Sequence, residues 1–328
     1  MNPVNLALRT FGSLVSPSGR NGRLSILIYH RVLKKADPLL PFEVDAERFD
    51  AQMAALKAIC NVIPLHEAVQ GLESGKLPSR AACITFDDGY ADNHDVALPI
   101  LEKHNLHATF FVSTGYLDGG IMFNDKAIEI VRRAERNDLD LSGKGLGVYS
   151  LERSEARRKA VAHLLSDLKY KPLEERNEIM DSIAADLEIS FPEDIMMTSS
   201  QVKALHDAGM EIGGHTVHHP ILSRLENAAA RKEMMEGKAR LEEITGNRVR
   251  IFAYPNGIPG RDYLVEHARM AKDLGFEAAV STAKGVSRSG SDLFQLPRFT
   301  PWDMDISRFS MRLAANLLQT DFATVGRS

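Results

Sequence analysis

The sequence predicts an α/β fold, a distorted (β/α) barrel of about seven or eight strand–helix units with a helical insertion. Short apolar runs alternate with amphipathic helical segments, which favours parallel β–α units over a β-sandwich. The alternation stops over residues 117–198 and then resumes. Polar residues follow several of the apolar runs, as in barrels whose reactive groups lie where strands end. An open doubly wound sheet would show the same alternation and is the alternative.

The first half of the chain supplies strands and helices in regular order. Phe49, Met53 and Leu56 recur at helical spacing, and Asp45 is placed to cap the helix that contains them. The expected elements are strand 23–32, helix 45–59, a short strand in NVIPL, a helix over HEAVQGLESG ending at Gly75, strand 82–86, a helix over HDVALPILEKH and strand 107–113.

Residues 117–198 contain charged amphipathic helices, and we expect no strands between them. This insertion could serve as a lid or a partner surface, or only elaborate the packing. After it, Thr198 or Ser199 is placed to cap the next helix. The expected elements there are a helix over SSQVKALHD, strand MEIGGH, helix 225–245, strand VRIFAYP, helix 261–274, strand FEAAVST, a last strand near LFQLPRF and a helix over SRFSMRLAANLLQ.

Length and composition point to a globular protein. The 328 residues could form one large domain or two ordinary ones, and we expect a single domain over 1–328 with residues 1–22 as an N-terminal extension. The formal net charge is −4 and no basic stripe stands out, so nucleic acid is not an expected partner. Cys60 and Cys83 lie in or after apolar runs and are expected to be buried free thiols, with a disulfide or metal role as the lesser alternative.

The N-terminal segment does not resemble a secretory signal, because Arg9 and neighbouring polar residues interrupt its apolar run. No stretch approaches the roughly 18 apolar residues of a membrane span. Leu8, Phe11, Leu14 and Val15 share one helical face, which we expect to pack against the body of the protein. The alternative is peripheral membrane association. We therefore expect a cytoplasmic protein. If the helix binds a membrane, we expect the protein at the inner membrane face. We make no prediction of its oligomeric state.

Two adjacent carboxylates stand at the end of an apolar strand in ACITFDDGYADN, where Asp87 and Asp88 require a partner. EIGGHTVHHP supplies His215 and His219, four residues apart after another expected strand. On a helical turn this spacing places both imidazoles on one face, with His218 pointing elsewhere. One carboxylate and two imidazoles leave a coordination position open, as a catalytic zinc site requires. The alternative is an ordinary Asp-Asp-Gly turn and solvated histidines.

These segments resemble the motifs of the polysaccharide deacetylase family, carbohydrate esterase family 4 with its NodB-like domain. TFDDGY (85–90) is similar to the first motif, HTVHH (215–219) to the second and FAYPNG (252–257) to the third. The resemblance covers residues 24–115 and 199–300. It implies a distorted (β/α) barrel and the metal-dependent removal of acetyl groups, N-acetyl rather than O-acetyl by preference, from a sugar polymer.

The resemblance also implies roles for individual residues. Asp88, His215 and His219 would bind a divalent ion, with zinc as the default and cobalt, nickel or manganese as alternatives. Asp87 would be the general base that takes a proton from the attacking water.

The third motif would contact the substrate through Tyr254, Pro255 and Asn256. A backbone N–H near Asn256 would share the oxyanion charge. The alternative for this segment is a plain strand-ending turn, which Pro-Asn-Gly favours without any function.

Two features depart from the family pattern. Ala253 stands where an arginine normally holds the base, and no histidine follows His267 to act as general acid. His30, at the end of the first strand in a Tyr-His pair, resembles a branch of the family in which this histidine donates the proton to the leaving amine. Arg298 in QLPRF is a candidate to hold the base, and Arg31 is its rival.

The favoured function is thus a hydrolase of non-peptide carbon–nitrogen bonds that deacetylates a glycan such as exopolysaccharide, peptidoglycan or a lipid-linked precursor. A second hypothesis is hydrolysis of the carbon–nitrogen bond of a small amide at the same site. A third is a catalytically inactive carbohydrate-binding module. For the deacetylase and for the carbohydrate-binding module, the expected partner is an acetylated sugar chain.

Overall fold

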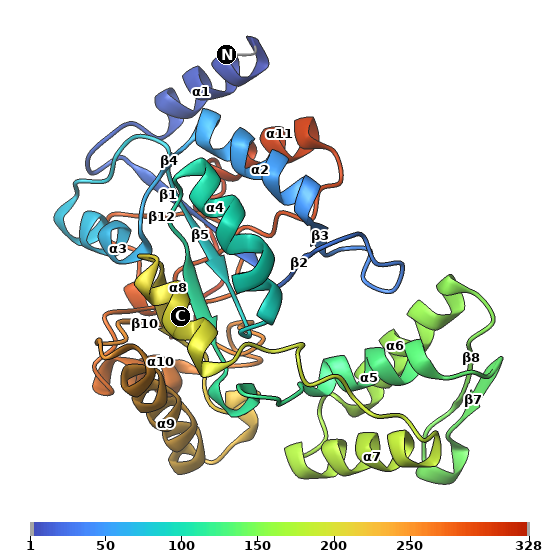
Figure 1. Cartoon of the computed structure of the whole chain (residues 1–328). Coiled ribbons are helices and arrows are strands. Elements are labelled where there is room, and N and C mark those ends of the chain that lie inside the picture. The colour runs from blue at the N-terminus through green and yellow to red at the C-terminus, as the bar shows by residue number, and fades with distance from the viewer. Residues whose placement is uncertain (1–2, 327–328) are drawn as a thin grey trace.

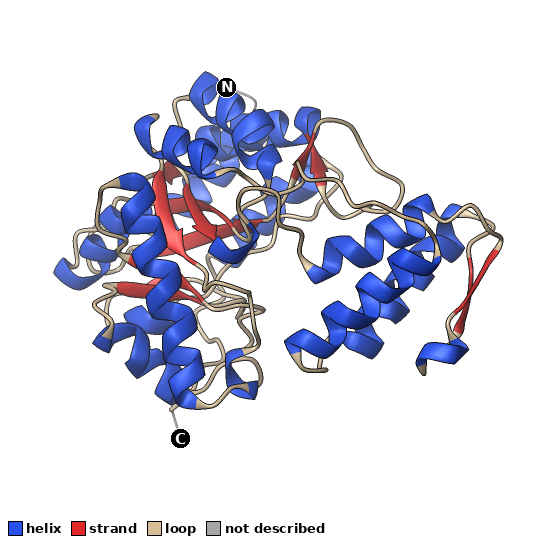
Figure 2. Ribbon diagram, turned by 60° about the horizontal axis from the view of Figure 1, so that its bottom comes forward, coloured by secondary structure: helices blue, strands red, loops and turns tan. Residues whose placement is uncertain are grey.

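A curled, mainly parallel sheet surrounded by helices forms the larger part of the chain (Figure 1; Figure 2). The computed structural model describes residues 3–326, so the first two residues of the expected 1–22 extension, and residues 327–328, lie outside the described part. The sheet runs in the order β11-β10-β9-β6-β5-β1-β12, with β4 also paired to β5. Its strands are β1 (Arg23–Tyr29), β4 (Asn61–Val62), β5 (Ala81–Phe86), β6 (Thr109–Val112), β9 (Glu211–Gly214), β10 (Ile251–Ala253), β11 (Ala278–Val280) and β12 (Ser287–Arg288).

Every pairing in this sheet is parallel except that of β12 with β1. The strands are buried on both faces, which explains why their sequences are continuous apolar runs rather than alternating ones. A separate parallel pair is formed by β2 (Val32–Leu33) and β3 (Val44–Asp45). The predicted β–α alternation is confirmed.

The segment 296–299 lies between β11, at one end of the sheet, and β1, next to its other end. Leu296 bridges to Val280 of β11, and Phe299 bridges to Leu27 of β1, both in parallel. The N–H of Phe299 donates to the carbonyl of Ile26 at 2.7 Å. Residue 297 is a proline, which has no N–H to donate to a ladder, and the segment makes isolated bridges rather than a regular strand. The segment closes the sheet into the distorted barrel that the sequence predicts.

Helices cover the outside of the barrel (Figure 2). Asp45 caps α2 by accepting a hydrogen bond from the N–H of Arg48 at 2.9 Å, and Thr198 caps α8 in a capping box with Gln201, as predicted. The covering helices are α1 (Pro3–Val15), α2 (Ala46–Ile59), α3 (Leu65–Ser74), α4 (Leu98–His104), α8 (Ser199–Asp207), α9 (Asn227–Thr245), α10 (Val265–Asp273) and α11 (Ile306–Asn316).

The insertion stands to the side of the barrel, in green at the lower right of Figure 1. It consists of α5 (Phe123–Arg133), β7 (Asp138–Asp140), β8 (Val148–Ser150), α6 (Ser154–Leu168) and α7 (Leu173–Asp186), and it has a hydrophobic core of its own. The antiparallel β7–β8 hairpin shows that the expectation of a strand-free insertion is wrong. Each strand has three residues and buries only its central one, which is too short a pattern to identify from the sequence.

The N-terminal helix α1 contacts α2 and α11. Leu8 and the buried Gly12 face the body, whereas Leu14 is 79% exposed and Phe11 38% exposed. The predicted packing of the face formed by Leu8, Phe11, Leu14 and Val15 is therefore wrong for Phe11 and Leu14, whereas Leu8 and Val15 are partly buried. Within residues 3–326, no helix combines the length and the apolar character needed to cross a bilayer.

Both cysteines are buried and unpaired, as predicted: Cys60 follows α2 and Cys83 lies in β5. Burial raises the pKa of Cys60 to about 12, so its thiol stays protonated near neutral pH.

Candidate active site

Asp87 and Asp88 follow β5 at the carboxyl end of the barrel strands. Both are buried, at 3% and 5% exposure. Asp88 has a φ of 77° and Gly89 a φ of 94°, so the chain turns sharply through two left-handed residues. Aspartate is one of the few residues besides glycine that tolerates this conformation. The turn leaves two carboxylates side by side at the strand end.

His215 and His219 reach Asp88 from a loop after β9. The Nε2 atoms of the two imidazoles each lie 3.4 Å from Oδ1 of Asp88. One ligand atom from each of the three residues lies within 4.8 Å of the others. The expected helical turn is wrong, because the segment is an irregular loop in which Thr216 and His219 have φ values of 67° and 51°. The structure thus brings the three side chains together by a different backbone route.

Helix α9 holds this loop in place. The carboxylate of Glu233 accepts hydrogen bonds from the N–H groups of Val217 and His218 at 2.9 and 2.8 Å. It also contacts Nδ1 of His218 at 2.8 Å, so this imidazole is directed away from Asp88, as predicted. Gly237 lies against the loop, because a Cβ there would be 2.8 Å from the carbonyl oxygen of Thr216.

Neither Glu233 nor Gly237 was identified from the sequence. Glutamate is ordinary in a charged helix, so Glu233 carries no local signal. A glycine inside a helical pattern costs about 1 kcal/mol relative to alanine, and Gly237 is therefore the one signal that could have shown a close approach to this helix.

The residues present fit a divalent metal ion. Oδ1 of Asp88 is buried and has no hydrogen-bond partner among residues 3–326, although both imidazoles face it. Nδ1 of His215 contacts the carbonyl of Ala253 at 2.8 Å, which fixes the orientation of its Nε2. Two imidazole nitrogens and one carboxylate oxygen are a donor set that zinc and similar ions accept.

The electrostatics of the three side chains agree with this fit. Burial lowers the pKa of His219 to about 4, so its imidazole is neutral at pH 7 and offers a lone pair. Burial would raise the pKa of Asp88, but His219 and His215 beside it outweigh burial and lower that pKa. Asp88 is therefore an anion that faces two nitrogens.

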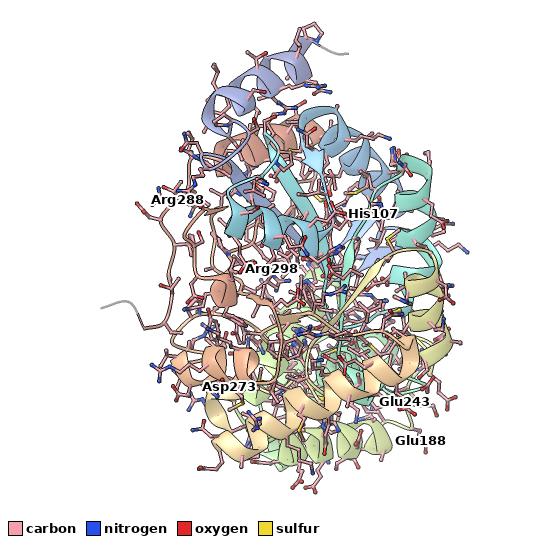
Figure 3. The ribbon with its side chains drawn as sticks, turned by 90° about the vertical axis from the view of Figure 1, so that its left-hand side faces the viewer. His107, Glu188, Glu243, Asp273, Arg288 and Arg298 are labelled. Atoms are coloured by element: carbon pink, nitrogen blue, oxygen red, sulfur yellow. The ribbon has the colours of Figure 1, made fainter. Side chains whose placement is uncertain are left out.

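Arg298 forms a bidentate ion pair with Asp87. Its two terminal nitrogens lie 2.7 Å from Oδ1 and Oδ2 of the carboxylate. The guanidinium, on the segment that closes the barrel, is 1% exposed, and Figure 3 shows Arg298 inside the molecule. Burial would raise the pKa of Asp87, but Arg298 outweighs it and keeps the carboxylate ionised. The rival candidate, Arg31, instead pairs with Asp92 at 2.8 Å.

His30 follows β1 on the same rim of the barrel. Its side chain is partly buried, and its charge helps to lower the pKa of both Asp87 and Asp88. The carbonyl of His30 accepts a hydrogen bond from the side chain of Asn93 at 2.8 Å, which fixes the backbone at this strand end. Tyr29 pairs with Phe86, so His30 and Asp87 follow neighbouring strand ends, and the role of His30 as an acid stays a prediction.

The third motif is only partly available to a substrate. Tyr254 is fully buried, its ring stacks on Tyr263 at 3.9 Å between centroids, and its hydroxyl donates to the carbonyl of Phe294. The prediction that its side chain contacts the substrate is wrong, because the end of β10 points it into the core. Pro255 is also buried, whereas Asn256, with a φ of 58°, lines a cavity beside His219.

That cavity, of about 160 Å³, lies between the barrel and the insertion. A cavity of about 320 Å³ lies at the opposite end of the strands, where Ala108, Met210 and Val249 precede β6, β9 and β10. In barrels of this kind the reactive groups lie at the carboxyl ends of the strands, so the smaller cavity is the relevant one.

The fold and the site define a class of barrel hydrolases with a candidate metal centre at the carboxyl end of the strands. The sequence matches the family model of polysaccharide deacetylase over residues 74–279, which is more than half of the chain. The protein belongs to this family, and as predicted it falls among the hydrolases of carbon–nitrogen bonds.

Individual deacetylases are similar to this chain in sequence or in fold. A poly-beta-1,6-N-acetyl-D-glucosamine N-deacetylase of Staphylococcus epidermidis is 35% identical over 105 residues, which is 28% of this chain and 36% of that protein. The structure of the Streptococcus pyogenes deacetylase PplD in complex with acetate covers 91% of this chain and 97% of its own, with a TM-score of 0.59 and 21% identity. The structure of IcaB from Ammonifex degensii covers 91% of this chain and 98% of its own, with a TM-score of 0.58 and 18% identity. At these identities the two structures support the fold alone.

Proposed function

We propose that this protein is a metal-dependent deacetylase that removes acetyl groups, preferably N-acetyl groups, from a glycan. One observation carries the proposal: a buried, unpartnered carboxylate oxygen of Asp88 faces two imidazoles, next to a second carboxylate that Arg298 keeps ionised. The relative from S. epidermidis is named for an N-acetylated amino-sugar polymer, which supports an exopolysaccharide as the substrate class.

Asp88, His215 and His219 would hold the ion, with zinc as the first candidate. A bound divalent ion supplies Lewis-acid chemistry, which polarises an acetyl carbonyl and favours deprotonation of water.

The other residues at the strand ends provide proton transfer and orientation. Asp87 accepts the proton of the attacking water, and Arg298 keeps this base ionised and aimed by two hydrogen bonds. His30 donates a proton to the leaving amine from the neighbouring strand end. A backbone N–H near Asn256 donates to the oxyanion.

The direct test is acetate release from N-acetylated chito-oligosaccharides by the purified full chain with added zinc. Asp87→Asn should reduce turnover by about 10²–10⁴-fold, because a general base contributes that much, while the bound zinc is retained. Asp207→Asn, which changes an aspartate that is 57% exposed on α8, is the matched control and should leave turnover unchanged.

Two results would contradict the proposal: wild-type turnover in Asp87→Asn, or a wild-type chain that binds no divalent ion. Sugar binding without any turnover would instead support an inactive carbohydrate-binding module.

A further inference from the structure

The insertion and the barrel share a groove that begins at the candidate metal centre. The cavity of about 160 Å³ is lined by His219 from the barrel and by Lys169 and Arg176 from the insertion. A second cavity, of about 310 Å³, shares Lys169 and Arg176 and extends to Arg224. We call the two cavities together the insertion groove.

Arg176 is a buried cation that has no acidic partner among residues 3–326. The residue is 8% exposed, and its Nε has no hydrogen-bond partner within residues 3–326. Its guanidinium lies 4.8 Å from the centre of the Phe123 ring and near the hydroxyl of Tyr116, and burial lowers its pKa. An isolated buried charge is costly unless an opposite charge compensates it.

The other charged side chains that line the groove are cations. Lys169 is partly buried, and burial lowers its pKa more than the nearby Asp262 raises it. The Asp262 carboxylate is paired with Arg261, and no carboxylate forms an ion pair with Lys169 among residues 3–326. Arg224 packs over the ring of Tyr170 at 5.6 Å. No Asp or Glu lines either cavity in this part of the chain. The other buried arginine of the site, Arg298, has its carboxylate partner at 2.7 Å.

We propose that the insertion groove binds an anionic group, a carboxylate or a phosphate, carried by the glycan next to the sugar whose acetyl group faces His219. This inference rests on the proposed function and narrows its substrate to acidic glycans. Arginine suits either anion, because its planar donors match both carboxylate and phosphate oxygens. An acidic neighbour on the sugar chain would supply the charge that Arg176 lacks.

The test is calorimetric binding of three probes to the full zinc-loaded chain carrying Asp87→Asn, so that the probes are not consumed. The probes are neutral chitotetraose, a hyaluronan tetrasaccharide with carboxylates, and a 6-phosphorylated chitotetraose. At least one acidic probe should bind about tenfold or more tightly than the neutral one, since charge-assisted hydrogen bonds are strong. Which acidic probe binds more tightly identifies the anion.

Adding Arg176→Gln to the chain that carries Asp87→Asn should abolish the preference for acidic probes and leave the affinity for chitotetraose unchanged. Its melting temperature should not fall, because an uncompensated buried charge is removed. Lys159→Gln, at an exposed position of α6, is the control and should keep the preference. Lys169→Gln, at a more exposed groove position, should weaken the preference and provides a second test if Arg176→Gln does not fold.

Equal affinity for all three probes would overturn the inference. So would an Arg176→Gln chain that loses affinity for every probe equally and melts at a lower temperature, because Arg176 would then only support Phe123. Acetate release from chitotetraose by the chain without Asp87→Asn tests the proposed function separately. Release without any anion preference would reject this inference alone.

Discussion

The ion pair of Asp87 and Arg298 contributes to the free energy of unfolding and also keeps the candidate base ionised. Arg298→Met leaves Asp87 buried without its cation, so we expect the free energy of unfolding to fall by about 3–5 kcal/mol. The double variant with Asp87→Asn should be more stable than Arg298→Met alone, because it no longer buries an unpaired charge. Urea denaturation of the wild type, both single variants and the double variant measures this coupling.

Arg288→Met at an exposed position of β12 is the control and should change the free energy of unfolding by less than about 0.5 kcal/mol. Additive effects of the Asp87 and Arg298 substitutions would show that the pair is not a coupled unit.

Asp125 of α5 makes stability depend on pH. Burial raises its pKa to about 7, with Asp88 and Asp92 adding to the effect, while Arg31 at 3.7 Å and the Tyr90 hydroxyl at 3.1 Å oppose it. An unfolded aspartate titrates near pH 4, so the folded state binds the extra proton between about pH 4 and 7. The stability from this proton is complete below about pH 4 and is lost as the pH rises through 7.

We therefore expect Asp125→Asn to melt close to the wild type at pH 4–5 and a few degrees above it at pH 8. Differential scanning fluorimetry across this range measures the difference. A difference that does not change with pH would contradict the raised pKa of Asp125.

At the scale of the element, α9 determines where the loop with His215 and His219 lies. An alanine in place of a helical glycine normally adds about 1 kcal/mol of stability. At Gly237, however, the new Cβ would be 2.8 Å from backbone atoms of Thr216, so the loop must move. We expect Gly237→Ala to weaken zinc affinity by about 10–100-fold, as the loss of groups that position metal ligands does.

Competition with a zinc-binding dye measures this affinity. Gly71→Ala in α3 is a matched control, because the one close contact of its Cβ would be with a terminal methyl group of Leu77, at 2.9 Å, and not with backbone atoms. Unchanged zinc affinity in Gly237→Ala would show that the loop does not depend on this contact.

The sequence predicts elements well where a pattern is local and poorly where tertiary contacts decide. The apolar run 82–86 and the aspartates after it suffice to place Asp87 and Asp88 at a strand end. The left-handed backbone at Thr216 and His219 has no local signal, because neither residue type favours it over other conformations. Glu233 and Gly237 likewise become important only once α9 lies against the loop.

At the scale of the whole molecule, the barrel is closed by a segment far along the chain from the strand it reaches. The apolar run LFQLPRF predicts a last strand, which is wrong, because the structure has a 3₁₀ turn over Leu293–Gln295 and then two isolated bridges. The run also gives no sign that the segment bridges β11 to β1. Only this closure brings Arg298 to Asp87, since 211 positions separate them in the sequence. Topology of this kind depends on long-range contacts that no local pattern contains.

The insertion leaves and re-enters the barrel at adjacent points, because the N–H of Asp118 donates to the carbonyl of Met197 at 3.1 Å. Its core is separate from that of the barrel. Replacing residues 121–194 with a short Gly-Ser linker should therefore leave a barrel that unfolds cooperatively and still binds zinc. Its melting temperature should be lower, because Tyr90 and Tyr116 lose the cover of Met122.

Circular dichroism melts and the zinc stoichiometry of this shortened chain measure both expectations. The metal ligands all come from the barrel, so zinc binding should survive, whereas any preference for acidic glycans should be lost with Lys169 and Arg176. A chain with no cooperative transition would mean that the barrel requires the insertion to fold. A folded barrel without zinc would mean that α5 and its neighbours, rather than α9 alone, keep the metal-binding loops in position.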